Sequence, residues 1–457
     1  MAEHPVEPTY ILARAIDEIA HDGSKTGQDL KTDSAHPAAP GDEPDADAAS
    51  VVSDTSTLQY SHEPFETYKT RVQQLCQDLW PALPKDSFAV ERLKGGGFNR
   101  IIGINVRFLR DAKLARRLIQ KLRSSLGLKT EDKYSIEQYI LRIPRFDTAW
   151  VDYEIAMVKY VEQNTSLPVP EIIKFDLTNK NALEEMFTVQ RRISGQSLYD
   201  VYPALTHQQR VSIARSFANI VREIQANSCS AAGLLNPHPS GKSQNSELEL
   251  LQFEVPSREF KEEPGPPPMT PSIPQSTLDF LLTQMDRWTA YEHCYFFEVW
   301  DGMRKMATQM NEQGLFDDNK HYLCHLDLEP RNVPVKVNPE TVCIEGVLDW
   351  DSAIFAPRFM GCEPPAWIWR WADAEEVEMG GELKDAGIMP ADAEARELKA
   401  IFDEAVGERY LRYAYKPEYR LARKLCHTAI YGMNSDWVLR QAEEMLEEWE
   451  RMRRSKE

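Results

Sequence analysis

Four side chains between residues 325 and 349 have the types and spacing that phosphoryl transfer requires. His325, Asp327 and Asn332 form the pattern H-x-D-x-x-x-x-N, and Asp349 follows at the end of the next predicted strand. One carboxylate can orient an acceptor hydroxyl, while an amide and a second carboxylate can hold the metal that neutralises developing phosphate charge. The spacing therefore predicts transfer from Mg-ATP, with Asp327 at the hydroxyl and Asn332 and Asp349 as ligands of Mg²⁺.

A predicted strand pair explains how the two metal-binding residues meet. Residues 333–337 and 342–348 are apolar runs joined by a turn at 338–341. An antiparallel hairpin of this kind returns the chain, so Asp349 is expected beside Asn332.

Three further residues of this segment have secondary roles in the interpretation. His325 is expected to brace the loop through hydrogen bonds rather than to shuttle a proton. Arg331 is expected to order the loop or to pair with a nearby acid. Asp351 is either a second acid of the site or an exposed loop residue.

Upstream, the sequence predicts a small mixed lobe. Strands are expected at residues 87–93, 101–106, 139–143 and 185–190, and a helix is expected at residues 151–164. The loop between the first two strands either brings backbone N–H groups to a phosphate or makes a plain hairpin turn. This loop comprises Gly95, Gly96, Gly97, Phe98 and Asn99.

Two charged residues of this lobe have a functional and a plain interpretation. Arg142, in the third strand, can deliver positive charge to the nucleotide phosphates, and Glu154, in the helix, can be its partner. The alternative is a solvent-exposed arginine and a solvated glutamate.

The downstream half is predicted to be mostly helical. Thr206 and Gln209 form a capping-box pattern, and apolar residues at helical spacing follow it. A last helix is expected around residues 439–452. The tryptophans at 367, 369 and 371 either line a pocket or pack a connection, and packing is the preferred interpretation.

Composition narrows the class of protein. The 457 residues carry a net charge of −19, which argues against nucleic-acid binding, and 42% are hydrophobic, which suffices for a core. Seven scattered cysteines without a C-x-x-C pair argue for a reducing compartment and against a zinc site. Because neither a signal peptide nor a membrane-spanning run is recognisable, a cytoplasmic location is expected.

The expected organisation has three parts. Residues 1–60 form a disordered acidic, Pro-rich tail, residues 65–195 the N-lobe and residues 196–457 the helical C-lobe. A basic helical insertion is expected at 107–130, as an ordinary surface helix or a contact for anionic lipid, and a Pro-rich insertion at about 236–277.

The motifs together resemble the aminoglycoside phosphotransferase family, and in particular its large fungal branch. The resemblance covers about residues 65–450 and leaves the tail outside. The motifs that carry it are GGGFNR at 95–100, YILRIPR at 139–145, PVP at 168–170, FTVQRRISG at 187–195, HLDLEPRN at 325–332, GVLDWD at 346–351 and PPAW at 364–367.

The resemblance implies an α+β, protein-kinase-like two-lobed fold: a small N-lobe with an antiparallel sheet and one main helix, and a larger, mostly helical C-lobe. It implies ATP and Mg as cofactors, Asp327 as catalytic base, and a hinge that binds adenine at Gln190, Arg191 and Ile193. Arg142 departs from the lysine that many members have. Members act on varied acceptors, so the resemblance does not select aminoglycosides.

The first hypothesis is an ATP- and Mg²⁺-dependent kinase of a small-molecule hydroxyl compound. The alternative is a catalytically weak or inactive pseudokinase that senses nucleotide or binds a protein. Arg142, the tails and the basic insertion favour this alternative, and the joint retention of Asp327, Asn332 and Asp349 opposes it. A protein kinase is disfavoured because residues 351–364 are short for an activation loop.

Overall fold

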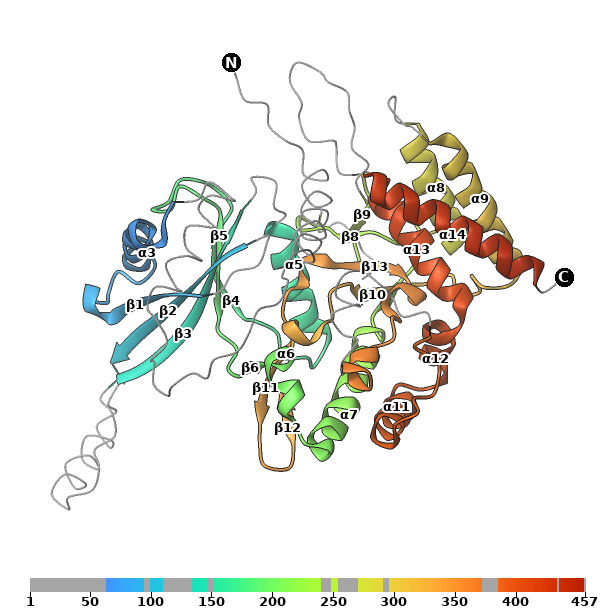
Figure 1. Ribbon diagram of the computed structural model, residues 1–457. Helices are drawn as coiled ribbons and strands as arrows, with labels where there is room; N and C mark the ends of the chain where they lie inside the picture. Colours follow the sequence, from blue (N-terminus) through green and yellow to red (C-terminus); the bar gives the residue numbers. More distant parts are fainter. Residues whose placement is uncertain are drawn as a thin grey trace, which may run out of the picture. The chain divides into compact units, whose positions relative to one another are not determined.

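The computed structural model describes residues 63–93, 99–109, 134–145, 151–239, 248–253, 270–290, 296–371, 385–433 and 435–455. These residues form two compact units (Figure 1). The smaller comprises the described residues up to Val151 together with Glu171–Arg192, and the larger comprises Asp152–Pro170 and the chain from Ile193 onward. The expected tail, the loop at 94–98 and most of both expected insertions lie outside the described residues.

The smaller unit is built on a five-stranded antiparallel sheet with the order β1-β2-β3-β5-β4. The strands are β1 Phe88–Arg92, β2 Asn99–Leu109, β3 Tyr134–Pro144, β4 Ile172–Asp176 and β5 Phe187–Arg191. Because side chains alternate along a strand, Ile102, Ile104 and Val106 of β2 all enter the core. Residues 107–109, where the basic helical insertion was expected to begin, still belong to β2, so that start is wrong.

A helix that the sequence analysis did not identify completes this core. Helix α3, Phe65–Leu79, buries Tyr68, Val72, Leu75 and Cys76, whose spacing places them on one face. A short 3₁₀ turn, η1 at Lys85–Ser87, leads into β1.

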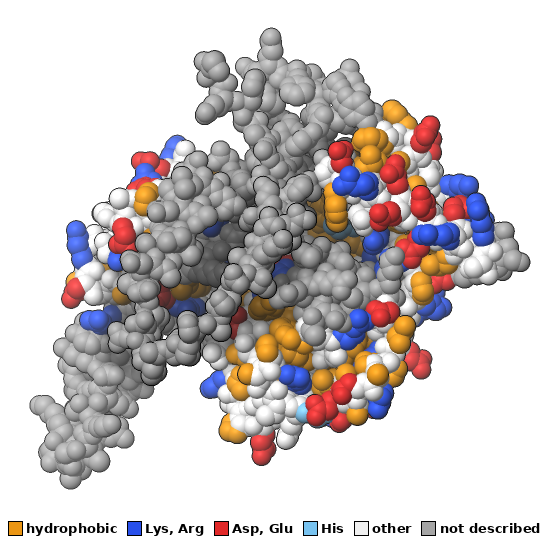
Figure 2. All heavy atoms as spheres, viewed as in Figure 1, with side chains coloured by type: hydrophobic (Ala, Val, Ile, Leu, Met, Phe, Trp, Pro, Cys, Tyr) orange, Lys and Arg blue, Asp and Glu red, His pale blue; other side chains and the backbone are white. Residues whose placement is uncertain are grey.

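The larger unit is mostly helical, as expected. Its helices are α5 Val151–Asn164, α6 Leu198–Val201, α7 His207–Ile224, α8 Thr277–Thr289, α9 Phe297–Glu312, α11 Ala393–Val406, α12 Glu408–Tyr415, α13 Pro417–Tyr431 and α14 Asp436–Arg454. The 3₁₀ turns are η2 Tyr202–Ala204, η3 Pro330–Asn332, η4 Trp350–Ser352, η5 Arg358–Gly361 and η6 Ala366–Ile368. Acidic and basic side chains are mixed over this unit on the face shown in Figure 2.

Short strands of the larger unit form three small sheets. Their orders are β13-β10-β7, β12-β11-β6 and β8-β9. The strands are β6 Gln196–Ser197, β7 Ser228–Cys229, β8 Leu234–Leu235, β9 Leu250–Leu251, β10 His321–His325, β11 Pro334–Val337, β12 Val342–Ile344 and β13 Ala353–Pro357. Strand β9 lies within the expected Pro-rich insertion, so part of that stretch pairs with the body of the unit.

Helix α5 has the bounds that the sequence predicts, but all of it except Val151 groups with the larger unit rather than with the expected N-lobe. The contacts explain this. The Tyr160 ring packs edge-on against Phe355 at 5.6 Å, and its hydroxyl donates to Asn227 at 3.3 Å. Beyond the helix, the Pro168 carbonyl accepts the Val347 N–H.

The predicted capping box of α7 is present. The Thr206 N–H donates to Gln209 Oε1 at 2.9 Å, and the Gln209 N–H donates to Thr206 Oγ1 at 3.3 Å. These bonds satisfy backbone groups that a helix start otherwise leaves unpaired. The tryptophan segment packs onto this helix: Trp367 meets Phe217 edge-on at 5.0 Å, and both are buried. Packing, the preferred interpretation, is therefore confirmed for Trp367.

Buried His321 predicts an acid-sensitive fold. It is fully buried at the start of β10 and meets Phe280 edge-on at 5.8 Å. Desolvation lowers its pKa to about 4, against about 6.5 in an unfolded chain. The unfolded state therefore binds more protons between these values, so stability falls as pH drops from about 6.5 to 4, by at most about 3 kcal/mol from this residue.

Urea denaturation of the wild type and His321→Leu at pH 7.5, 6.0 and 5.0 measures this effect. We expect the free energy of unfolding to fall less steeply in the variant than in the wild type as the pH is lowered. Parallel pH dependences for the two proteins would show that His321 does not cause the acid sensitivity.

Candidate active site

The loop after β10 is compact because its backbone bonds to itself. The Glu329 N–H donates to the Asp327 carbonyl, and the Asn332 N–H donates to the Glu329 carbonyl, each at 2.9 Å. The turn η3 then leads into β11, and just before that strand the Leu198 N–H donates to the Val333 carbonyl at 3.0 Å. These bonds fix the loop between two strands, so its side chains have defined directions.

The Asp327 carboxylate is held by two neighbours in the sequence. Arg331 Nη2 donates to Oδ1, and Asn332 Nδ2 donates to Oδ2 at 2.7 Å. The same Nδ2 also donates to the Asp327 carbonyl at 2.8 Å. The structure therefore brings together Asp327, Arg331 and Asn332, and Arg331 pairs with a nearby acid as expected.

The orientation of Asn332 suits a metal ligand. Its side chain is largely buried, and its Nδ2 donates both hydrogen bonds to Asp327, so the amide oxygen is not needed to hold Asp327 and could bind a cation. Amide and carboxylate oxygens are hard ligands of the kind that Mg²⁺ accepts. Among the described residues no three His, Cys, Asp or Glu side chains form a metal cluster, so an ion at Asn332 and Asp349 would need further ligands such as phosphate oxygens and water.

His325 is placed to brace the loop. Its Nε2 lies 2.8 Å from the Leu348 carbonyl oxygen, and its Nδ1 accepts the Asp327 N–H at 3.2 Å. These partners define a neutral ring protonated at Nε2. The ring is buried edge-on against Trp350 at 4.7 Å, and desolvation lowers its pKa. Protonating Nδ1 would break the bond to Asp327, so the contacts favour bracing over proton shuttling.

The hairpin returns the chain to Asn332 as the sequence predicts. The Leu348 N–H donates to the Asn332 carbonyl at 2.9 Å, which places Asp349 next along the chain. The second strand is shorter than expected and ends at Ile344 rather than at Leu348. Beyond it the chain is held instead by Val347, whose N–H donates to the Pro168 carbonyl at 2.9 Å.

Asp349 has a left-handed backbone, with φ of 65° and ψ of 56°. Asp tolerates this region better than most residues, and such conformations often occur at functional sites. The turn η4 follows, and Trp350 Nε1 donates to the Val347 carbonyl at 3.0 Å. Asp351 is exposed, which agrees with the interpretation as a loop residue.

Gly346 lets its own segment approach Ile193 and Pro168 closely. A Cβ at this position would lie 2.4 Å from Ile193 Cδ1 and 3.3 Å from the Pro168 oxygen. The glycine therefore leaves room for the Pro168 carbonyl that binds Val347. The sequence analysis assigned no role to Pro168, Leu348 or Trp350; the only signals were the PVP and GVLDWD motifs themselves.

The expected nucleotide-binding residues are distributed over both units. Gly95, Gly96, Gly97 and Phe98 lie outside the described residues, and Asn99 begins β2. Arg142 lies in β3, paired with Ile101 and Thr188 in the smaller unit. Glu154 lies in α5 of the larger unit and is 6% exposed, so it is not the solvated glutamate of the plain interpretation.

The expected hinge begins at the end of β5. Gln190 is buried in this strand, and the Arg191 N–H donates to the Glu171 carbonyl at 2.8 Å. The Arg191 guanidinium pairs with Glu171 at 2.7 Å and with Glu137 at 3.1 Å, which raises its pKa. Adenine binding by Gln190, Arg191 and Ile193 stays a prediction. The Arg191 N–H is already bonded to the Glu171 carbonyl.

Residues 128–398 match the phosphotransferase enzyme family, APH. Since this match spans more than half of the chain, the protein belongs to that family and is a phosphotransferase of kinase type. No curated protein matches the sequence. In the part of the chain that the structure describes, no helix is long and apolar enough to cross a membrane.

Several solved structures of aminoglycoside phosphotransferases are similar to the chain. A mutant of aminoglycoside 2'-phosphotransferase-IIIa in complex with GDP has 14% identity and a TM-score of 0.42, covering 84% of this chain and 97% of that chain. The GDP and kanamycin complex of APH(2")-IIIa has 14% identity and a TM-score of 0.38, covering 83% and 98%. A thermostable mutant of APH(4)-Ia in the apo form has 14% identity and a TM-score of 0.41, covering 79% and 96%.

Proposed function

We propose that the protein transfers the γ-phosphoryl group of ATP to a hydroxyl group of a small molecule, with Mg²⁺ as cofactor. The observation that carries the proposal is the arrangement of Asp327 and Asn332, in which the amide nitrogen of Asn332 donates to the Asp327 carboxylate. Membership of the phosphotransferase family supports the reaction class.

In this proposal Asp327 accepts a hydrogen bond from the acceptor hydroxyl and orients its oxygen for in-line attack. A bond forms between that oxygen and the γ-phosphorus, and the bond to the bridging oxygen of ADP breaks. The hydroxyl proton passes to the Asp327 carboxylate. Arg331 and Asn332 position the carboxylate, since each donates to one of its two oxygens.

Asn332 and Asp349 are the residues that would hold the metal, which supplies positive charge to the phosphates when bound. The hydrogen bond from Leu348 to the Asn332 carbonyl keeps the two ligand-bearing segments together. His325 supports both, because one ring nitrogen binds each segment.

An acceptor screen tests the proposal. The purified chain is incubated with ATP, Mg²⁺ and single hydroxyl compounds: amino alcohols, hydroxy amino acids, sugars and aminoglycosides. We expect ADP release to rise with one of these classes and a phosphate ester to appear by ³¹P NMR. Phosphorylation of a carboxylate or a guanidinium in place of a hydroxyl would contradict the proposed acceptor class while keeping the family assignment.

A further inference from the structure

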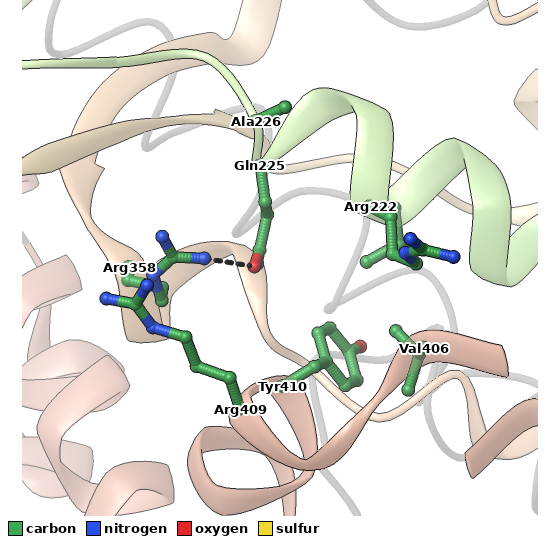
Figure 3. A pocket seen from close by; sticks show the side chains of 8 residues that line it. Arg222, Gln225, Ala226, Arg358, Val406, Arg409 and Tyr410 are labelled. Atoms are coloured by element: carbon green, nitrogen blue, oxygen red, sulfur yellow. Dashed lines mark hydrogen bonds between the residues drawn. The ribbon is translucent and has the colours of Figure 1, made fainter. Parts of the chain in front are cut away.

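A cavity of about 230 Å³ lies in the larger unit where several helix ends meet. It is formed by the end of α7, the turn η5, the end of α11 and the start of α12 (Figure 3). Its lining residues are Val221, Arg222, Gln225, Ala226, Arg358, Val406, Arg409 and Tyr410. None of them is a residue of the candidate active site, so the cavity is a separate feature.

The lining is strongly positive. Three of its side chains are arginines and none is acidic. Asp318, outside the lining, contacts both Arg358, at 3.6 Å from Nε, and Arg409. One carboxylate thus faces two guanidinium groups, and with Arg222 the cavity keeps a surplus of about two positive charges.

Arg358 is fixed in place before any ligand binds. Its side chain is 12% exposed, and its guanidinium lies over the Tyr322 ring at 3.5 Å. Nη1 donates to Gln225 Oε1 at 3.3 Å, the bond drawn in Figure 3. Its Nε is buried and has no hydrogen-bond acceptor among the described residues. A pre-positioned arginine loses little side-chain entropy on binding an anion.

The two other arginines lie nearer the solvent than Arg358, and Arg409 is paired with Asp318. Figure 3 shows the Arg409 guanidinium beside that of Arg358, while Arg222 stands on α7 at the other side of the cavity with its guanidinium directed away from that pair. Arg222 and Arg409 are exposed, and Arg222 makes one long contact, 3.5 Å to the Ala405 carbonyl. Val406 and the Tyr410 ring give the cavity an apolar wall. The start of α12 adds the positive end of a helix dipole.

From this geometry we infer that the cavity is a binding site for a small phosphate monoester. The dianionic phosphate matches the charge surplus, and planar guanidinium groups bind its oxygens in pairs. Pockets for drug-sized ligands usually exceed about 300 Å³, so this cavity fits a phosphate with a few carbon atoms and not a nucleotide. The apolar wall faces the carbon portion.

Calorimetric titration of the full chain with inorganic phosphate and with glycerol 3-phosphate tests this site. We expect both to bind, glycerol 3-phosphate more tightly, and glycerol not to bind. Arg222→Gln and Arg409→Gln should each weaken binding about 10-fold or more, because each removes charge-assisted hydrogen bonds. Arg409→Lys should keep more affinity than Arg409→Gln.

Arg215→Gln is the matched control, since it removes an exposed arginine from the same helix α7 without touching the cavity. Titration in the presence of AMP-PNP distinguishes this site from the nucleotide site, and thermal melting shows that each variant folds. Undiminished phosphate binding in Arg222→Gln and Arg409→Gln, displacement of phosphate by AMP-PNP, or no wild-type binding below about 1 mM would each overturn the inference.

Discussion

Asp327→Asn is expected to abolish phosphoryl transfer while leaving the fold unchanged. The asparagine has nearly the same shape, and its Oδ1 can still accept a hydrogen bond from Asn332 or Arg331, which now hold the carboxylate. It cannot accept the proton of an acceptor hydroxyl. Loss of a positioned general base typically costs about 10²- to 10⁴-fold in rate. Product formation at saturating ATP, with thermal melting as the folding check, measures the effect.

Asp351→Asn is the matched comparison, because Asp351 is exposed two residues beyond Asp349. We expect its rate to stay near that of the wild type. If Asp327→Asn retained full turnover, or if Asp351→Asn lost as much, the assignment of the base would be wrong.

Lys399→Ala is expected to destabilise the larger unit strongly. The Lys399 side chain is 2% exposed in α11, and its Nζ lies 2.6 Å from Asp403 Oδ2. The ammonium lies 3.8 Å from the centre of the Tyr415 ring, whose hydroxyl donates to the same carboxylate. Removing the lysine leaves a carboxylate that is only 20% exposed without its cation. Such a loss costs about 3–5 kcal/mol, because the remaining charge is poorly solvated.

Two further variants separate charge from packing. Lys399→Met keeps most of the side-chain volume. The difference in the free energy of unfolding between Lys399→Met and Lys399→Ala therefore measures the cost of the cavity that alanine leaves. Arg453→Ala removes one partner of an ion pair on α14 whose side chains are 28% and 39% exposed, and should cost under about 1 kcal/mol. Urea denaturation compares the three. Equal urea midpoints for Lys399→Ala and Arg453→Ala would show that the buried ion pair of Lys399 contributes no more than an exposed one.

The loop at residues 325–332 was the most predictable part of the molecule. Asp327, Asn332 and Asp349 lie close together in the sequence, so their spacing alone predicted their proposed roles. The turn between two apolar runs predicted the hairpin that returns the chain. Local signals also sufficed for the capping box of α7 and for the bounds of α5. Hydrogen bonds between neighbours in the sequence determine these features, so a local pattern reveals them.

Features that depend on distant contacts could not be predicted. Strand β12 ends early because Val347 bonds to Pro168, which lies far away in the sequence. For the same reason α5 groups with the larger unit, through Tyr160 and its partners. Helix α3 is different, because the apolar spacing of its buried face is visible in the local sequence.

The positive cavity also lay beyond sequence reasoning. Its arginines come from α7, η5 and α12, which are separated by many residues and carry no shared motif. Only the packing of these elements places the three arginines around one cavity. Burial of His321 and Lys399 is equally a product of tertiary packing, since nothing in their local sequence distinguishes them from surface residues.

Calorimetric titration with ATP, with and without Mg²⁺, on the wild type and Asp349→Asn tests the central claim most directly. The account predicts binding that requires Mg²⁺ and is weakened at least 10-fold in the variant, because a charged metal ligand is lost. Binding of ATP without any Mg²⁺ dependence would instead favour a pseudokinase that senses nucleotide. Absence of ATP binding under every condition would contradict the proposed phosphotransferase mechanism.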